Sequence, residues 1–439
     1  MDKLEEAVGR CLRRLPFGRK VAPLQTRLAS FGEQGLQGAA NLLVNVILAR
    51  HLGHESFAII GVMLGTHYFV HGIHRSSVVI TYILNASQDP KDQAHRRWWW
   101  FNLLAIGLAA MAIAVVAVLG FALTNAGQRW FVTGIALCVM VTPSLLFFEF
   151  GRRMLYQQRR SSTAAFASAV YLVLNLGVAA LASRGSGGVI AGSLAWVAAG
   201  LGGGAIATLA NTPGAPQIRD ACEEWWRHRS FAFWQALTNV PYSIYNSSAV
   251  ILVGLFGGAP AAAAFTAART LTSPAISIVT AVDSLDKPRA AQALKRDGMR
   301  GLRRSVEQTR RTLAVLCGAY LAALVVGAPL VLHLAFGNLY AAEVPEIRLL
   351  ALAFFLICMN QPSETLLTVL RKSKLLLLTR LAAATVAVAS LALARPYGLM
   401  GCVLALLATQ LINLANLRIA EWVAARGHDL TSTLNGVRA

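Results

Sequence analysis

Apolar residues fill most of this chain in runs of about 20 residues, the length that one helix needs to cross a bilayer. Short polar or basic connections separate the runs from one another. Twelve runs can be distinguished, at residues 31–50, 56–84, 99–123, 130–149, 164–181, 188–209, 231–256, 261–282, 313–334, 347–370, 375–394 and 399–420. This pattern predicts an all-α polytopic membrane protein with about twelve transmembrane helices.

The runs divide into two sets of six, on either side of a polar gap. Each set opens with a hairpin whose turn contains a glycine, Gly53 in the first and Gly257 in the second. Because each set crosses an even number of times, we expect parallel repeats related by a pseudo-two-fold axis normal to the membrane, with substrate at their interface. The predicted divisions are a basic N-terminal segment 1–30, an N-terminal half 31–210, a linker 211–230, a C-terminal half 231–422 that contains a basic linker 286–311, and a tail 423–439.

Charge changes this picture by giving it an orientation. The net charge is +20, yet only 14% of the residues are charged, against about a quarter in soluble domains. Lysine and arginine gather in alternate connections, most densely in residues 286–311. Connections rich in these residues stay in the cytoplasm, so we expect both termini to be cytoplasmic. The excess of positive charge is thereby explained by the membrane, and we expect no nucleic-acid partner.

Arg269 lies near the middle of the run 261–282, too deep for its charge to reach the surface easily. An arginine there costs several kcal/mol unless it has a partner or water. Two interpretations remain open: Arg269 binds an anion such as a phosphate bidentately, or it forms a structural ion pair with Glu33 or Glu364. Both acids are also candidates for coupling to H⁺ or Na⁺, because an intramembrane carboxylate can exchange a cation during a transport cycle.

Three histidines and one arginine form a stripe on the second predicted helix. His67, His71, His74 and Arg75 follow the spacing i, i+4, i+7, i+8, which places them on one side of a helix. We interpret Arg75, His71 and His74 as cations that face a cavity, the alternative being an Arg75 that extends toward the cytoplasmic surface. No nearby cysteine or carboxylate completes a ligand set with these histidines, so we expect no metal site.

The seventh run is rich in polar side chains around a proline kink at Pro241. Amides, hydroxyls and aromatic faces are the groups that bind a sugar, by hydrogen bonds at its edges and stacking beneath it. A wall of a sugar-binding cavity is one interpretation, and polar packing between helices is the other. The candidate wall residues are Gln235, Asn239, Tyr242, Tyr245 and Asn246.

The stretch 31–58 resembles the opening helix of a known family. Asn41 and Asn45 give it one polar face, which we expect to turn toward protein or a watery cavity. Its matching residues are Glu33-Gln34, Gly38, Asn41-Leu42, Leu48-Ala49-Arg50-His51-Leu52-Gly53 and Phe57. They resemble Wzx-type oligosaccharide flippases of the multidrug/oligosaccharidyl-lipid/polysaccharide (MOP) exporter superfamily, although Glu33, Leu42 and Ala58 replace the family's usual Asp, Phe and Gly.

The resemblance implies a transporter of the bacterial inner membrane. Its substrate would be a lipid-linked oligosaccharide carried on a polyprenyl diphosphate, used for surface polysaccharides such as the O antigen of lipopolysaccharide. It also implies a polysaccharide polymerase and chain-length proteins as partners. Two rival hypotheses remain open, a cation-coupled multidrug exporter of the same superfamily and a membrane polysaccharide polymerase or ligase. The outer connections are short and no ATP-binding motif GxxxxGK[ST] occurs, so we expect a transporter rather than an enzyme or an ATP-driven pump, and no cofactor.

Overall fold

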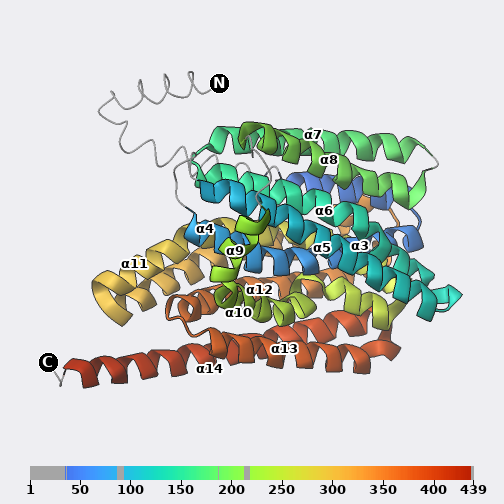
Figure 1. Ribbon diagram of the computed structural model, residues 1–439. Coiled ribbons are helices and arrows are strands. Elements are labelled where there is room, and N and C mark those ends of the chain that lie inside the picture. The colour runs from blue at the N-terminus through green and yellow to red at the C-terminus, as the bar shows by residue number, and fades with distance from the viewer. Residues whose placement is uncertain (1–34, 36, 87–92, 186, 212–217, 437–439) are drawn as a thin grey trace, which may run out of the picture.

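A computed structural model describes residues 35, 37–86, 93–185, 187–211 and 218–436 of the chain. Within these ranges the backbone is helical almost throughout, contains no strand, and forms long helices that run side by side (Figure 1). Seven described helices are long and apolar enough to cross a membrane, and two of them, 249–336 and 373–426, contain more than one crossing. The protein is therefore an all-α, multi-pass membrane protein, as predicted.

The helices of the first half pack around α6. Their order is a helix at 37–51, α3 (His54–His74), a π-helical turn η1 (Arg75–Val79), α4 (Ile80–Asn85), α5 (Gln93–Leu123), η2 (Ala126–Gln128), α6 (Arg129–Gln157), α7 (Ser161–Arg184) and α8 (Gly188–Asn211). α3, α5 and α8 all pack against α6, and α7 packs against α8. Each predicted run of this half is helical at all of its described residues.

The second half is ordered in the same manner around α12. It comprises α9 (Ile218–Arg227), α10 (Arg229–Tyr242), a π-helical turn η3 (Ser243–Ser247), α11 (Ala249–Phe336), η4 (Ala341–Glu343), α12 (Val344–Val369), α13 (Ser373–Ala394), η5 (Arg395–Tyr397) and α14 (Gly398–Gly436). The 88 residues of α11 are divided into three arms by non-helical backbone at Gly258 and Gly298. The φ of Gly258 is 79°, which glycine adopts without steric cost, so the hairpin turn lies one residue beyond the predicted Gly257.

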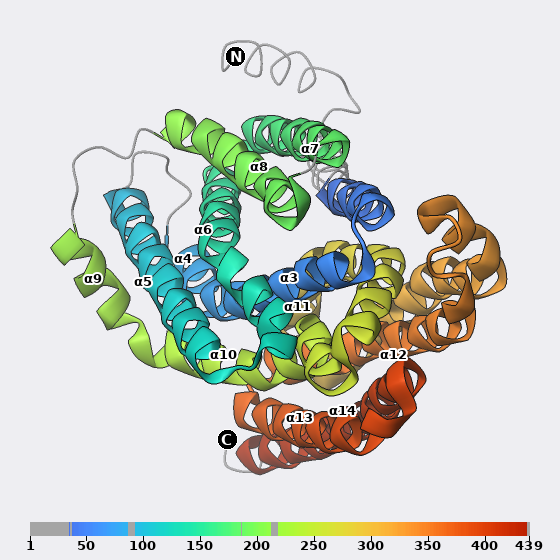
Figure 2. The same ribbon diagram turned by 90° about the vertical axis from the view of Figure 1, so that its right-hand side faces the viewer.

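α3 of the first half and α11 of the second half meet at the interface between the halves, as the view along the helices shows (Figure 2). Their contact is close because Gly61 of α3 faces Thr266 of α11, where a Cβ would come within 2.1 Å of the threonine hydroxyl. Buried apolar residues, among them Phe57, Met63 and Phe265, continue this contact into one core shared by both halves. The two halves are thus sealed together along part of the length of α3.

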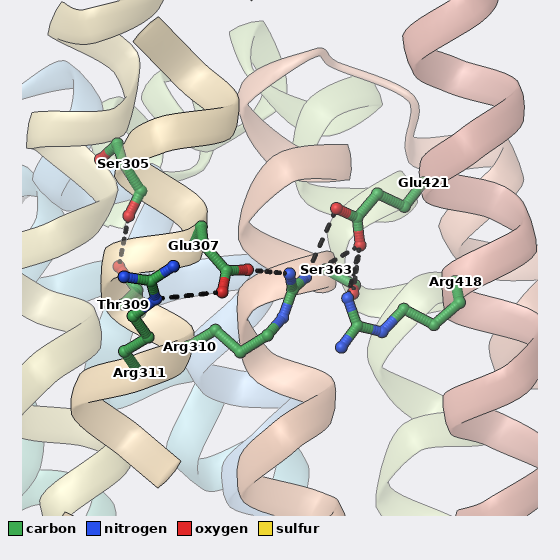
Figure 3. A network of polar contacts seen from close by, with 8 residues as sticks. All are labelled: Ser305, Glu307, Thr309, Arg310, Arg311, Ser363, Arg418 and Glu421. Atoms are coloured by element: carbon green, nitrogen blue, oxygen red, sulfur yellow. Dashed lines mark hydrogen bonds and ion pairs between the residues drawn. The ribbon is translucent and has the colours of Figure 1, made fainter. Parts of the chain in front are cut away.

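One end of the second half is held together by ion pairs among three helices (Figure 3). Glu421 of α14 accepts hydrogen bonds from Ser363 of α12 at 2.7 Å and from Arg310 of α11 at 3.1 Å. Arg310 also donates to Glu307 at 2.6 Å, and this hydrogen bond is the main reason that the pKa of the Glu307 carboxyl lies below its usual range. These contacts, with Arg418 3.6 Å from Glu421, tie α11, α12 and α14 into one unit.

Gly200 of α8 gives a test of packing in the first half. A Cβ at this position would lie 2.6 Å from the backbone carbon and oxygen of Ser144 in α6, and backbone cannot yield as a side-chain tip can. We expect Gly200→Ala to lower the free energy of unfolding by about 1–3 kcal/mol, the usual cost of overpacking. The control is Gly177→Ala in α7, where nothing lies within 4 Å and alanine favours the helix. Equal thermal stability of the two purified variants would contradict this packing.

Candidate functional site

A cavity lies between the two halves and consists of two compartments. Their volumes are about 240 and about 160 Å³, and both are lined by Asn41, Leu64, Tyr68 and Thr280. A larger cavity of about 500 Å³ lies along the arms of α11, lined largely by aliphatic and hydroxyl side chains, and it contains none of the predicted site residues. The candidate site is therefore the pair of central compartments.

We call the larger central space the Arg269 compartment. Arg269 reaches it from the second arm of α11, and its guanidinium lies over the ring of Tyr68, 5.1 Å from the ring centroid. Among the described residues, no carboxylate lies within ion-pair distance of Arg269. Asn45, Asn246 and Thr266 line the same space. The compartment thus offers one positive charge that has no carboxylate partner among the described residues, surrounded by amides, hydroxyls and an aromatic face.

We call the smaller space the Arg75 compartment. Arg75 is the first residue of the π-helical turn η1, and π-helical turns are frequent at functional sites. Arg75 is exposed although it belongs to a membrane-spanning helix. Across the space lie Glu149, Arg152 and Arg153 of α6. Three arginines and one carboxylate therefore line this compartment, together with His67 and His71.

Glu149 is bound by both arginines of its own helix. Arg153 Nε donates to Glu149 Oε1 at 2.8 Å, and Arg152 Nη2 donates to Glu149 Oε2. The spacing i, i+3, i+4 places the three side chains on one face of α6. Sequence reasoning missed this group because both arginines follow the predicted run 130–149, in one of the basic connections that were expected in the cytoplasm. The available signal was that same spacing at the end of an apolar run.

The histidine stripe is placed only in part as predicted. His71 and Arg75 line the Arg75 compartment, and His67 lines it as well. His74 does not, and this corrects the prediction: it is buried, with its Nε2 2.8 Å from Asn102 Oδ1 of α5. On an ideal helix His74 and Arg75 are about 100° apart, at opposite edges of the stripe. One edge therefore faces α5 and the other faces the cavity.

The polar residues of the seventh run also divide. Tyr242 and Asn246 line the Arg269 compartment, while Gln235, two turns before Tyr242, lines neither space. Asn239 packs against Gly72 and donates to Ser243 Oγ at 3.3 Å. Tyr245 precedes Asn246, about 100° around the helix, and is buried against alanines of α13. Two of the five residues predicted for the cavity wall therefore line a compartment, and three do not.

The predicted coupling acids have different outcomes. Glu33 lies outside the described residues. Glu364 has an arginine partner, but that partner is Arg380 of α13, at 2.6 Å, rather than Arg75 or Arg269. Arg380 also donates to the carbonyl of Thr238 at 3.1 Å and lies over the ring of Tyr242, 4.6 Å from its centroid. The Arg380 guanidinium therefore binds Glu364 where a coupling H⁺ or Na⁺ was predicted to bind. Sequence reasoning missed this role of Arg380.

The described lining of the cavity therefore has an excess of positive charge. Four arginines line the two compartments, and the single lining carboxylate, Glu149, is already bound by two of them. Two further arrangements, Glu364 with Arg380 and Asp283 with Lys287 at 2.6 Å, neutralise other acids of the second half. An anion with more than one charged group is the ligand that this distribution favours.

Comparison with known proteins gives a family and a fold for this chain. A family model described as "Polysaccharide biosynthesis protein" matches residues 47–345. Several solved structures share the fold. One is an inward-facing multidrug resistance MATE family transporter of the MOP superfamily, with a TM-score of 0.68 and 14% identity over 91% of this chain and 99% of that one. Its outward-facing counterpart has a TM-score of 0.63 and 15% identity over 96% and 99%.

A third similar structure comes from Pyrococcus furiosus. It is a MOP superfamily transporter described by the words "reverse polarity of binding pocket suggests different function", with a TM-score of 0.63 and 14% identity over 96% of this chain and 98% of that one. No curated protein matches this chain in sequence. The structural neighbours show that the twelve-helix fold of two six-helix halves, predicted from the runs, is correct.

Proposed function

Because the chain belongs to the family of polysaccharide biosynthesis proteins and has the fold of MOP superfamily transporters, we propose that it flips a polyprenyl-diphosphate-linked oligosaccharide across the inner membrane by alternating access. The lipid tail stays in the bilayer while the diphosphate and the sugars cross through the central cavity. Both termini then lie in the cytoplasm, on the side of the basic connections. A polysaccharide polymerase and chain-length proteins are the partners that this role requires downstream.

The charge of the cavity is the observation that carries the proposal. A diphosphate has two anionic groups, and a guanidinium binds phosphate oxygens through two parallel hydrogen bonds. Arg269 and Arg75 lie in adjoining compartments that share Tyr68 and Asn41, and among the described residues neither has an ion-pair partner. Two such cations next to one another match two linked phosphates.

The sugars find suitable groups beside Arg269. Tyr68 and Tyr242 offer aromatic faces, and Asn41, Asn45 and Asn246 offer amides that both donate and accept hydrogen bonds. Tyr171 stacks on Phe148, with ring centroids 4.8 Å apart, and donates to Asn41 Oδ1 at 3.2 Å, which orients that amide. A lining of amides and aromatic faces suits a transporter whose cargo is rich in hydroxyl groups.

Multidrug export by the same fold is the main rival. A cationic drug would need a free carboxylate in the cavity, and Glu149, the one carboxylate that lines it among the described residues, is bound by arginine. The rival is also separated from the proposal by a simple binding experiment.

The experiment compares two ligands of opposite charge on the purified protein. We expect a short-chain polyprenyl diphosphate carrying a sugar to raise the melting temperature, and a lipophilic cation such as tetraphenylphosphonium to leave it unchanged. At a ligand concentration of 100 times the Kd, the expected gain is about 2.7 kcal/mol in the free energy of unfolding. Proteoliposomes that hold the protein should also flip a fluorescent form of the lipid. Stabilisation by the cation alone would favour drug export.

A further inference from the structure

Glu149 stands out in the cavity because it is an acid in a space that otherwise collects positive charge. Its two carboxylate oxygens are bound separately, Oε1 by Arg153 at 2.8 Å and Oε2 by Arg152. The Glu149 side chain is 8% exposed and that of Arg152 is 2% exposed, whereas that of Arg153 is 21% exposed. The two guanidinium groups therefore already hold an anion, and that anion belongs to the protein.

A phosphate would need the same guanidinium groups. Carboxylate and phosphate fit a guanidinium in the same bidentate manner, so the two anions compete for Arg152 and Arg153. Both anions cannot remain charged side by side in a space of about 160 Å³ without strong repulsion. Arg75, which faces this trio from η1, adds the positive charge that draws a second anion toward it.

We propose that Glu149 is a resident anion that occupies a phosphate subsite in the empty transporter and is displaced when substrate binds. The proposal rests on the function proposed above and adds Glu149, Arg152 and Arg153 to the substrate-binding residues. On displacement Glu149 takes up one proton from the water of the cavity, and it releases that proton when the phosphate leaves. Substrate binding is thereby linked to proton uptake at one named carboxylate.

Several groups face Glu149 and shape this exchange. Those on its own helix are Arg152 and Arg153, which favour its charged form. The others come from α3 with η1, from α7 and from the helix at 37–51: they are His67, His71, Arg75, Tyr68, Tyr171, Gln37 and Asn41. The balance is positive, which holds the carboxylate charged until a second anion arrives.

A purely structural role is the alternative, in which Glu149 only staples one face of α6. The location argues against it, because all three side chains line a cavity compartment and Arg153 is partly exposed there, while Arg152 is buried beside it. The chain also contains a true staple for comparison. Glu421 lies near two arginines as well, Arg310 at 3.1 Å and Arg418 at 3.6 Å, but it lines neither central compartment.

The test measures binding of inorganic pyrophosphate to the purified full-length protein by titration calorimetry. Glu149→Gln removes the charge and keeps the shape, so we expect its affinity for pyrophosphate to rise roughly tenfold or more. We also expect the mutant to take up close to one proton fewer per pyrophosphate than the wild type, as read in buffers of different ionisation enthalpy. The matched control Glu421→Gln should bind pyrophosphate with the affinity of the wild type.

Glu149→Gln removes the carboxylate that binds the buried Arg152 and can fold poorly for that reason. The double variant Glu149→Gln/Arg152→Gln removes the buried pair together and keeps Arg75 and Arg153. We expect it to melt close to the wild type and to show the lower proton uptake per pyrophosphate that is expected of Glu149→Gln, because the titrating carboxylate is absent from both variants. If Glu149→Gln binds pyrophosphate with the affinity and the proton uptake of the wild type, and the wild type flips lipid, the role of Glu149 is overturned and the proposed function stands. Absence of both pyrophosphate binding and flipping in the wild type would instead overturn the proposed function.

Discussion

Replacing Arg269 by alanine should abolish glycan export while the protein still reaches the membrane in normal amounts. Arg269 contacts the ring of Tyr68, and no described carboxylate loses a partner when it is removed. The fold is therefore spared, whereas the substrate loses a guanidinium whose charged hydrogen bonds contribute about 1.5–3 kcal/mol each. We expect at least a hundredfold loss of affinity for the lipid diphosphate. Arg269→Lys should retain part of the activity, because lysine keeps the positive charge but cannot form the two parallel hydrogen bonds of a guanidinium.

Arg380 provides the matched control, since it is also an arginine inside a predicted span of the second half. Its removal leaves Glu364 buried without its partner at 2.6 Å, which costs about 3–5 kcal/mol. We expect Arg380→Ala to lower protein abundance, and Arg380→Ala/Glu364→Gln to restore it. Abundance and export must be measured together in each variant. Export that survives in Arg269→Ala, or an abundance that falls as far as in Arg380→Ala, would contradict a phosphate-binding Arg269.

The fold could be predicted from the sequence because it follows from two quantities that are local. The length of each apolar run determines one crossing, and the even number of runs on each side of the polar gap determines two parallel halves. Both halves are seen in the arrangement around α6 and α12. Backbone detail was less accessible: neither π-helical turn, η1 or η3, follows from the hydropathy of its residues.

The candidate site could be predicted only where it depends on the position of a residue along and around its own helix. The positions of Arg269, Arg75, His71, Tyr242 and Asn246 follow from depth and periodicity. The pairing of Arg380 with Glu364 depends instead on the distance between α13 and α12, which periodicity does not contain. The sequence did contain a signal for Arg380, a single arginine within the apolar run 375–394.

Arg50 belongs to the motif that resembles the flippase family, and the structure gives it a definite task. It lies near the end of the helix 37–51 in the first half, and it donates to the carbonyls of Leu334 and Ala335 in the second half, the latter at 2.7 Å. These carbonyls end α11, where the last turn of a helix has no internal donors and carries partial negative charge. Arg50 therefore joins the two halves at this end of the bundle.

Aromatic residues complete the closure beside Arg50. The rings of His54 and Tyr340 meet edge to face, with centroids 5.2 Å apart. The ring centroid of Phe336 lies 5.5 Å from that of Tyr340. Tyr340 is buried by these contacts. In the transport cycle proposed above the halves separate at this end, so the hydrogen bonds of Arg50 would break once in each cycle. We call this group the Arg50 latch.

Removing the latch should shift the transporter toward conformations that are open at this end. A charged hydrogen bond contributes about 1.5–3 kcal/mol, so Arg50→Ala should raise the open population by roughly tenfold or more. A cysteine placed at Thr266, below the latch in the Arg269 compartment, would report it by faster labelling with a membrane-impermeant thiol reagent applied to cells. Arg50→Lys should have an intermediate effect, because one ammonium replaces the two-pronged contact.

Arg348 is the control for this experiment, because its Nε donates to the carbonyl of Val325 at 3.1 Å but both residues belong to the second half. Its contact does not cross the interface and need not break when the halves separate. We therefore expect Arg348→Ala to leave labelling at position 266 unchanged. Equal labelling of the Arg50 and Arg348 variants, whether both fast or both slow, would show that closure depends on the apolar contacts around Tyr340 and Phe336 rather than on the latch. Faster labelling in Arg50→Ala alone, with slower export of glycan, is the expected result, because a cavity held open at one end reloads less often at the other.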